Sequence, residues 1–149
     1  VREIDWGFVG DPNPKQLPVS TYRQLLEVEL VPVFAALTHD QQGQLLNTNA
    51  DTIASTIAVA LSGLYETALW FCFERPGLLA DPDQPASVIH QIDQTTYQQL
   101  KHDQVVTDGM IPKLDNAFAA LRQGVSQIRL GDSAILNRPE AGTTLTLNS

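Results

Sequence analysis

Residues 105–121 read VVTDGMIPKLDNAFAAL and combine a glycine-containing turn, a lone lysine and the start of an amphipathic helix. The apolar residues recur at the spacing of one helical face, at Ile111, Leu114, Phe118 and Leu121. This face should pack on a core. Pro112 is tolerated only in the first turn of a helix, so the segment predicts a helix that begins near Gly109.

The start of this helix has the composition of an anion site. Asp108 can cap the first free N–H groups, and Gly109 lets the backbone approach a ligand closely. Lys113 falls in the first turn, where a cation opposes the helix dipole, so a compensating anion such as a phosphate is expected nearby. The alternative is that Lys113 extends to water along its apolar stem while Asp108 merely caps the helix.

Composition and charge limit the classes to which this chain can belong. Its 149 residues are 43% hydrophobic, which suits one unit, residues 1–149, with a packed core. The net charge of -8 argues against nucleic acid or an anionic membrane as the main partner, since both need a concentrated basic face. No apolar run approaches the roughly 20 residues of a membrane span, and no signal peptide is recognisable. Cys72 is expected to be a buried small side chain in a reducing compartment.

A second polar group precedes another predicted helix. Asn47, Asn49 and Asp51 fall within five positions, directly before an apolar helix expected over residues 53–64. One such residue is enough to cap a helix, so three favour a polar site, with capping alone as the alternative. The histidines show no spacing typical of a metal site, and none is predicted.

The order of the predicted elements favours an α/β fold. Strands are expected over residues 2–10, 31–37, 68–73, 87–92, 126–130 and 143–147, and further helices over 22–30 and 95–101. The apolar runs 31–37 and 68–73 are typical of strands buried on both faces. Helices between strands imply a three-layer αβα sandwich around a mainly parallel sheet. Ligands of such sheets bind beyond the carboxyl ends of the strands, where residues 74–77 are expected.

Two motifs carry a resemblance to a known family. TDGMIPK at residues 107–113 and LNTNAD at 46–51 resemble the TDGMxxK and N-x-N-A-D segments of the N-acetyl-L-glutamate kinases, a branch of the amino acid kinase family. Both occur in the family's order and at about its separation. GFVG at 7–10, ERPG at 74–77 and GT at 142–143 extend the similarity across nearly the whole chain, and the wording is most similar to the Bacteroidetes-type branch.

The resemblance implies roles for particular residues. Asn47 would hydrogen-bond the α-carboxylate or amide region of the substrate, and Asp51 would organise the two catalytic lysines of the family. Lys113 would stabilise charge on the transferring phosphoryl group. The nucleotide would be framed by Glu74, Arg75, Gly77, Leu79, Val105, Val106, Thr107, Gly109 and Met110. ERPG at residues 74–77 differs from the DVSG that is common in the family.

The resemblance also implies an activity. The intact protein would use ATP and Mg²⁺ to phosphorylate the side-chain carboxylate of N-acetyl- or N-succinyl-L-glutamate, for arginine biosynthesis in the cytoplasm, as a homo-oligomer. This chain would be the C-terminal, nucleotide-binding portion. The family's N-terminal lysine and glycine-rich loops have no counterpart here, so the chain alone is expected to be inactive. The alternative is a catalytically silent nucleotide or amino-acid binding module; a carbamate or uridylate kinase relative matches the paired motifs less well.

Overall fold

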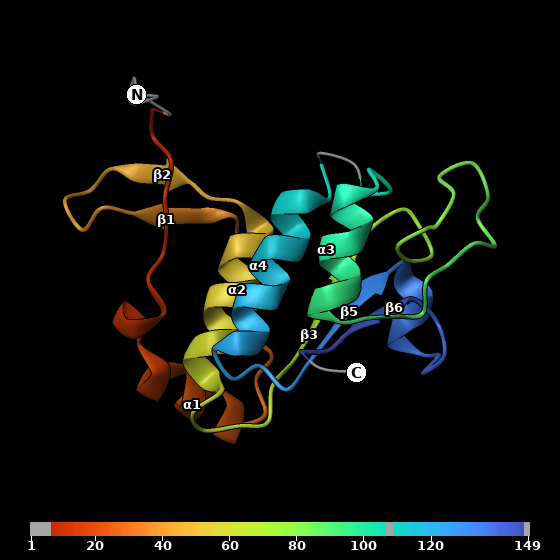
Figure 1. Ribbon diagram of the computed structural model, residues 1–149. Helices are drawn as coiled ribbons and strands as arrows, with labels where there is room; N and C mark the ends of the chain where they lie inside the picture. The colour runs from red at the N-terminus through yellow and green to blue at the C-terminus, as the bar shows by residue number, and fades with distance from the viewer. Residues whose placement is uncertain (1–6, 107–108, 148–149) are drawn as a thin grey trace.

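The computed structural model describes residues 7–106 and 109–147, which form a helical layer over one face of a small sheet (Figure 1). The elements follow in the order η1 (Pro14–Gln16), α1 (Val19–Glu27), β1 (Leu37–His39), β2 (Leu45–Asn47), α2 (Ala50–Leu61), β3 (Ala68–Cys72), β4 (Gln91–Ile92), α3 (Gln94–His102), α4 (Ile111–Arg122), β5 (Gln127–Gly131), η2 (Ser133–Leu136) and β6 (Thr143–Leu145). The predicted strand over residues 2–10 lies mostly outside the described residues; within them, Val9 forms only an isolated bridge to Asn47.

The main sheet has the strand order β3-β5-β6-β4. β3 pairs with β5 in parallel, with Trp70 opposite Arg129, and β4 pairs with β6 in parallel. β5 and β6 run antiparallel. The predicted α/β class with a mainly parallel sheet is therefore confirmed. β1 and β2 form a separate antiparallel pair that stands away from this sheet (Figure 1).

The core lies between the main sheet and the helices α2, α3 and α4 (Figure 1). Its largest fully buried side chains are Tyr97, Phe118, Ile92, Leu114, Ile128, Leu130 and Leu145. The rings of Tyr97 and Phe118 stack with centroids 5.2 Å apart, which joins α3 to α4. On the opposite face of β5, the described residues supply only the short η2 helix and the segment that follows it.

The two predicted helices are found with shifted boundaries: the helix predicted over residues 53–64 is α2, Ala50–Leu61, and the helix predicted to begin near Gly109 is α4, which begins at Ile111. The Asn49 side chain accepts hydrogen bonds from the backbone N–H groups of Asp51 and Thr52, at 2.8 and 3.2 Å, and so caps α2. Pro112 lies in the first turn of α4, and Gly124, with φ +103°, follows the end of that helix. The predicted cap at Asp108 lies outside the described residues.

Strand β3 is buried on one face only. Leu69 and Phe71 face the helices, whereas Trp70 and Cys72 are exposed on the other side. The prediction of a buried cysteine is wrong, because residues alternate between the two faces of a strand and Cys72 lies on the face opposite the core. In the described part of the chain, no α-helix covers the face that carries Cys72.

The apolar run 31–37 is not a buried strand. Val31 and Val33 are 85% and 93% exposed, and only Leu37 enters a strand, β1. The prediction failed because a parallel strand needs a hydrogen-bonded neighbour and cover on both faces. Within residues 7–106 and 109–147, only the end of this run is paired, where Ala36 accepts a hydrogen bond from Thr48 and Leu37 pairs with Asn47 in an antiparallel ladder.

The remaining differences concern boundaries. The helix predicted over 22–30 begins earlier and ends at Glu27, before Glu29 adopts φ +60°. The strand predicted over 87–92 shortens to β4, preceded by an isolated bridge between Leu79 and Val88. β6 ends at Leu145 rather than residue 147.

Candidate functional site

The first turns of α2 and α4 bring together the two residues to which the resemblance gives catalytic roles. Lys113 Nζ donates a hydrogen bond to Asp51 Oδ2 at 2.5 Å. Both side chains are largely shielded, with 18% and 30% of their surface exposed. The two helices pack side by side (Figure 1), so residues 62 apart in the sequence meet at one end of the helical layer. Lys113 therefore does not extend into water, and the anion beside it is Asp51.

An aromatic wall lines this lysine. Its Nζ lies 5.0 Å from the ring centroid of Phe71 and 6.0 Å from that of Phe73, at the carboxyl end of β3. Rings next to an ammonium group attract it and exclude water, which strengthens its interaction with charge. Neither ring was predicted from the sequence to belong to the site. The signal was the alternation Phe-Cys-Phe, which puts two aromatic side chains on one face of a strand.

A pocket beside the start of α4 gathers most of the residues predicted to frame a nucleotide. It is lined by Arg75, Gly77, Leu78, Leu79, Pro82, Val105 and Met110. Met110 lies one helical turn before Lys113, so the pocket adjoins the lysine through α4. At Gly77, a Cβ atom would lie 2.8 Å from Thr143 Oγ1 and 2.8 Å from Val88 Cγ1, so only glycine fits without displacing its neighbours.

Other predicted residues lie elsewhere. Glu74 and Gly109 are exposed and do not line the pocket, and Val106 is 4% exposed and belongs to the core. Thr107 lies outside the described residues. Asn47 ends β2, where its backbone pairs with Phe8 and Gly10. Its side chain is exposed, and no hydrogen bond to a described residue joins it to the Lys113–Asp51 pair.

The polar residues at 47–51 serve both purposes considered from the sequence, the capping of a helix and the formation of a polar site. Asn49 caps α2, as capping preference alone would suggest. Asp51, also in the first turn, reaches across to Lys113 instead. A polar site is therefore formed here, through one of the three residues.

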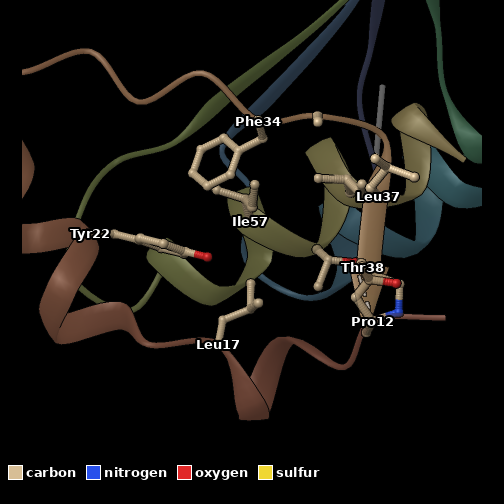
Figure 2. Close-up of a pocket in the computed structure, with 10 residues that line it drawn as sticks. Pro12, Leu17, Tyr22, Phe34, Leu37, Thr38 and Ile57 are labelled. Atoms are coloured by element: carbon tan, nitrogen blue, oxygen red, sulfur yellow. Dashed lines mark hydrogen bonds between the residues drawn. The ribbon is translucent and has the colours of Figure 1, made fainter. Parts of the chain in front are cut away.

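A second pocket lies between α1 and α2 (Figure 2). It is lined by Pro12, Leu17, Tyr22, Phe34, Ala35, Leu37, Thr38, Ile53, Thr56 and Ile57, none of which carries a charge. The rings of Tyr22 and Phe34 meet edge to face with centroids 5.3 Å apart. Such an apolar lining offers no counter-charge to a phosphate, so we do not assign this pocket to the chemistry of Lys113.

Among the described residues, no three histidine, cysteine or acidic side chains are grouped so as to hold a metal ion. In the same residues, no helix is both long and apolar enough to cross a membrane.

The fold and the site define a class. The pocket follows the carboxyl end of the parallel strand β3, which is where α/β proteins bind their ligands, and the lysine–carboxylate pair lies at the starts of two helices. The chain belongs to the amino acid kinase family, whose model matches residues 2–132. The α/β fold and the pairing of the two sequence motifs agree with this assignment.

Two similar curated relatives carry the same name, acetylglutamate kinase. The chain is 46% identical over 128 residues to the acetylglutamate kinase of Bacteroides thetaiotaomicron, covering 86% of this chain and 49% of the relative. It is 49% identical over 125 residues to the acetylglutamate kinase of Cytophaga hutchinsonii, covering 84% and 47%. The chain thus spans about half the length of the curated relatives it matches.

Solved structures show the same fold. The Streptococcus mutans UA159 protein smu.665 matches with a TM-score of 0.77 and 30% identity, over 96% of this chain and 53% of that one. The N-acetylglutamate synthase of Neisseria gonorrhoeae matches with a TM-score of 0.75 over 89% of this chain and 31% of that one. At 19% identity, this second likeness concerns the fold alone.

Proposed function

We propose that the protein carrying this chain transfers the γ-phosphoryl group of MgATP to the side-chain carboxylate of an N-acylated glutamate, N-acetyl or N-succinyl. The observation that carries the proposal is the Lys113–Asp51 pair beside the pocket at residues 75–79. The names of the relatives support the choice of substrate. The products are ADP and an acyl phosphate, for arginine biosynthesis.

The reaction needs charge neutralisation more than proton transfer. A carboxylate oxygen of the substrate forms a bond to the γ-phosphorus while the bond to the bridging oxygen of ADP breaks, and that oxygen keeps the electron pair. A glutamate side chain has an ordinary pKa of about 4.3, so the nucleophile is already ionised at neutral pH. Asp51 therefore acts as a positioning residue rather than a base. Lys113 stabilises negative charge on the phosphoryl oxygens.

The pocket suits the nucleotide. Gly77 packs closely against Thr143 and Val88, which fixes the backbone of the pocket wall, and Arg75 supplies a positive charge at the pocket lining. Magnesium in kinases is held largely by phosphate oxygens and water, so it would enter with ATP rather than occupy a dedicated cage of side chains. Asn47 contributes to binding the acylated amino acid.

The activity can be tested by trapping its product. The complete protein, incubated with MgATP, N-acetyl-L-glutamate and hydroxylamine, is expected to form a hydroxamate, because hydroxylamine cleaves acyl phosphates. A parallel reaction with N-succinyl-L-glutamate identifies the preferred acyl group, and one without ATP is the control. Binding of MgATP with no hydroxamate from either substrate would contradict the proposal and favour a catalytically silent nucleotide-binding module.

Association is the second part of the proposal. Large apolar side chains are exposed outside the site, including Val31, Val33 and Trp70. Their burial in an interface would stabilise an assembly, because the removal of apolar surface from water is favourable. We expect the complete protein to be a cytoplasmic homo-oligomer, and this chain alone to associate. Light scattering after size-exclusion chromatography measures both masses; a monodisperse monomer of this chain with cooperative melting would contradict the expectation.

A further inference from the structure

Arg129 is a buried cation outside the catalytic pair. It lies in β5 between the core residues Ile128 and Leu130, and only 5% of its surface is exposed. Because neighbours in a strand point to opposite faces, its side chain leaves the core side of the sheet. Its guanidinium lies 5.6 Å from the ring of Trp70. Among the described residues, no carboxylate lies within ion-pair distance of it.

The guanidinium is held by backbone carbonyl groups instead. Nη1 donates to the carbonyl of Ile135 at 3.1 Å, and Nη2 donates to those of Arg138 and Pro139 at 3.0 and 2.8 Å and to that of Ala141. Nε has no acceptor among the described residues. A buried charge is costly unless such bonds compensate it, so this arrangement ties residues 135–141 to β5.

The anchored segment leads directly into β6 through a tight turn. Gly142 adopts φ +80°, and a Cβ atom there would lie 2.5 Å from the carbonyl oxygen of Leu130. Only glycine fits this conformation and this approach without strain. Arg129 and Gly142 together therefore fix the position of the next residue, Thr143, which is fully buried.

Thr143 connects this turn to the pocket proposed for the nucleotide. Its Oγ1 accepts a hydrogen bond from the backbone N–H of Leu78 at 2.8 Å, in a buried setting. Gly77 packs against the same hydroxyl and against the backbone of Gly142. Gly77 and Leu78 line the pocket, so a displacement of residues 138–143 would be transmitted to its wall.

We infer that Arg129 is a positioning residue that sets nucleotide affinity, acting through the 135–141 segment and Thr143 on the backbone of residues 77–79. The inference rests on the proposed function, because it takes the pocket at residues 75–79 as the ATP site. Arg129 does not touch that pocket and does not contact Lys113. Its loss should therefore weaken ATP binding much more than it slows phosphoryl transfer.

The test compares the complete wild-type protein with Arg129→Lys. Lysine keeps the charge, but its single ammonium group cannot span the four carbonyls that the planar guanidinium reaches. The calorimetric Kd for MgATP is expected to rise about tenfold, roughly the loss of one well-placed hydrogen bond. The kcat is expected to stay within about threefold of wild type. Arg122→Lys, an exposed site at the end of α4, is the matched control.

Thr143 variants test the same connection from its other end. Thr143→Val removes the acceptor for the Leu78 N–H and should raise the Kd for MgATP by about the same factor, whereas Thr143→Ser keeps a hydroxyl and should restore binding. In the double variant Arg129→Lys/Thr143→Val, the loss should be smaller than the product of the single losses, because both act on one turn.

Each outcome decides the inference. An unchanged Kd in folded Arg129→Lys and Thr143→Val proteins, shown folded by circular dichroism, would overturn it, even if both melt earlier. If Arg129→Lys does not fold, the Kd of Thr143→Val against that of Thr143→Ser decides the matter alone. A fall in kcat with an unchanged Kd would also overturn it. No MgATP binding by the wild type would refute the proposed function, and this inference with it.

Discussion

Lys113→Ala in the complete protein is expected to lower the turnover of MgATP and acylglutamate by about a hundredfold or more. Phosphoryl transfer is catalysed by fixed positive charge and by positioning, and removal of one such group typically costs about 100- to 1,000-fold in kcat. The aromatic wall of Phe71 and Phe73 strengthens this charge, because it replaces water on one side of the ammonium group. Steady-state kinetics with saturating substrates measures the effect.

The variant should remain folded, which makes the kinetic result interpretable. Asp51 loses its partner, but 30% of its side chain is exposed and water can replace the ammonium group. Lys15→Ala is the matched control, because Lys15 is an exposed lysine in η1. A turnover of Lys113→Ala within about twofold of wild type would remove Lys113 from the mechanism. Calorimetry with MgATP shows whether the nucleotide still binds.

The second large effect concerns stability. Phe118→Ala is expected to lower the free energy of unfolding by about 3–5 kcal/mol, the usual cost of emptying a core site of this size. Phe118 is 1% exposed and stacks on Tyr97, which is itself fully buried. Tyr97 cannot move into the space, since its hydroxyl donates to Asp115 at 2.8 Å. The cavity should therefore persist. Urea unfolding followed by circular dichroism measures the change.

Phe8→Ala is the control for this experiment. Phe8 is 67% exposed, so the same truncation should change the free energy of unfolding by about 0.5 kcal/mol or less. Equal effects of the two substitutions would contradict the assignment of the core to the contact between α3 and α4. A Phe118→Ala variant too unstable to purify would agree with the assignment, provided that Phe8→Ala behaves as wild type.

The environment of Tyr97 in the core changes the pKa of its phenol group. Burial raises the pKa of its phenol above the ordinary value, and the hydrogen bond and negative charge of Asp115 raise it further. The raised pKa means that the phenol stays protonated, as a hydrogen-bond donor, at every pH at which the stability measurements are practical.

Local signals predicted the elements whose own residues suffice to define them. The 3.6-residue spacing of residues 111–121 identified α4, and the apolar spacing of residues 53–64 identified α2, because a helix satisfies its backbone internally. Asn49 was equally recognisable as a possible cap of α2. The roles proposed for Lys113 and Asp51 came from the resemblance of two sequence motifs to those of a known family. The spacing of the residues along the helix left a water-exposed Lys113 as an alternative.

Local sequence patterns could not predict which distant segments pair with one another. A run such as 31–37 is apolar whether it is buried or not, and its strand exists only where a neighbouring strand supplies hydrogen bonds. Cys72 was predicted buried for a similar reason, because the sequence does not show that only one face of β3 is covered by α-helices among the described residues. In the sequence, Arg129 is only a charged residue within an apolar strand. Its hydrogen bonds to the carbonyl groups of residues 135–141 depend on the tertiary structure.

The sequence by itself determined the helices, the α/β class and the two motifs on which the family assignment rests. These depend on local backbone hydrogen bonds and side-chain spacing. Only the tertiary structure decided that Lys113 meets Asp51, that residues 75–79 share a pocket with Met110, and that Arg129 holds the turn beneath it. Such contacts join residues far apart in the chain, and their geometry depends on how helices and strands pack rather than on any spacing within one segment.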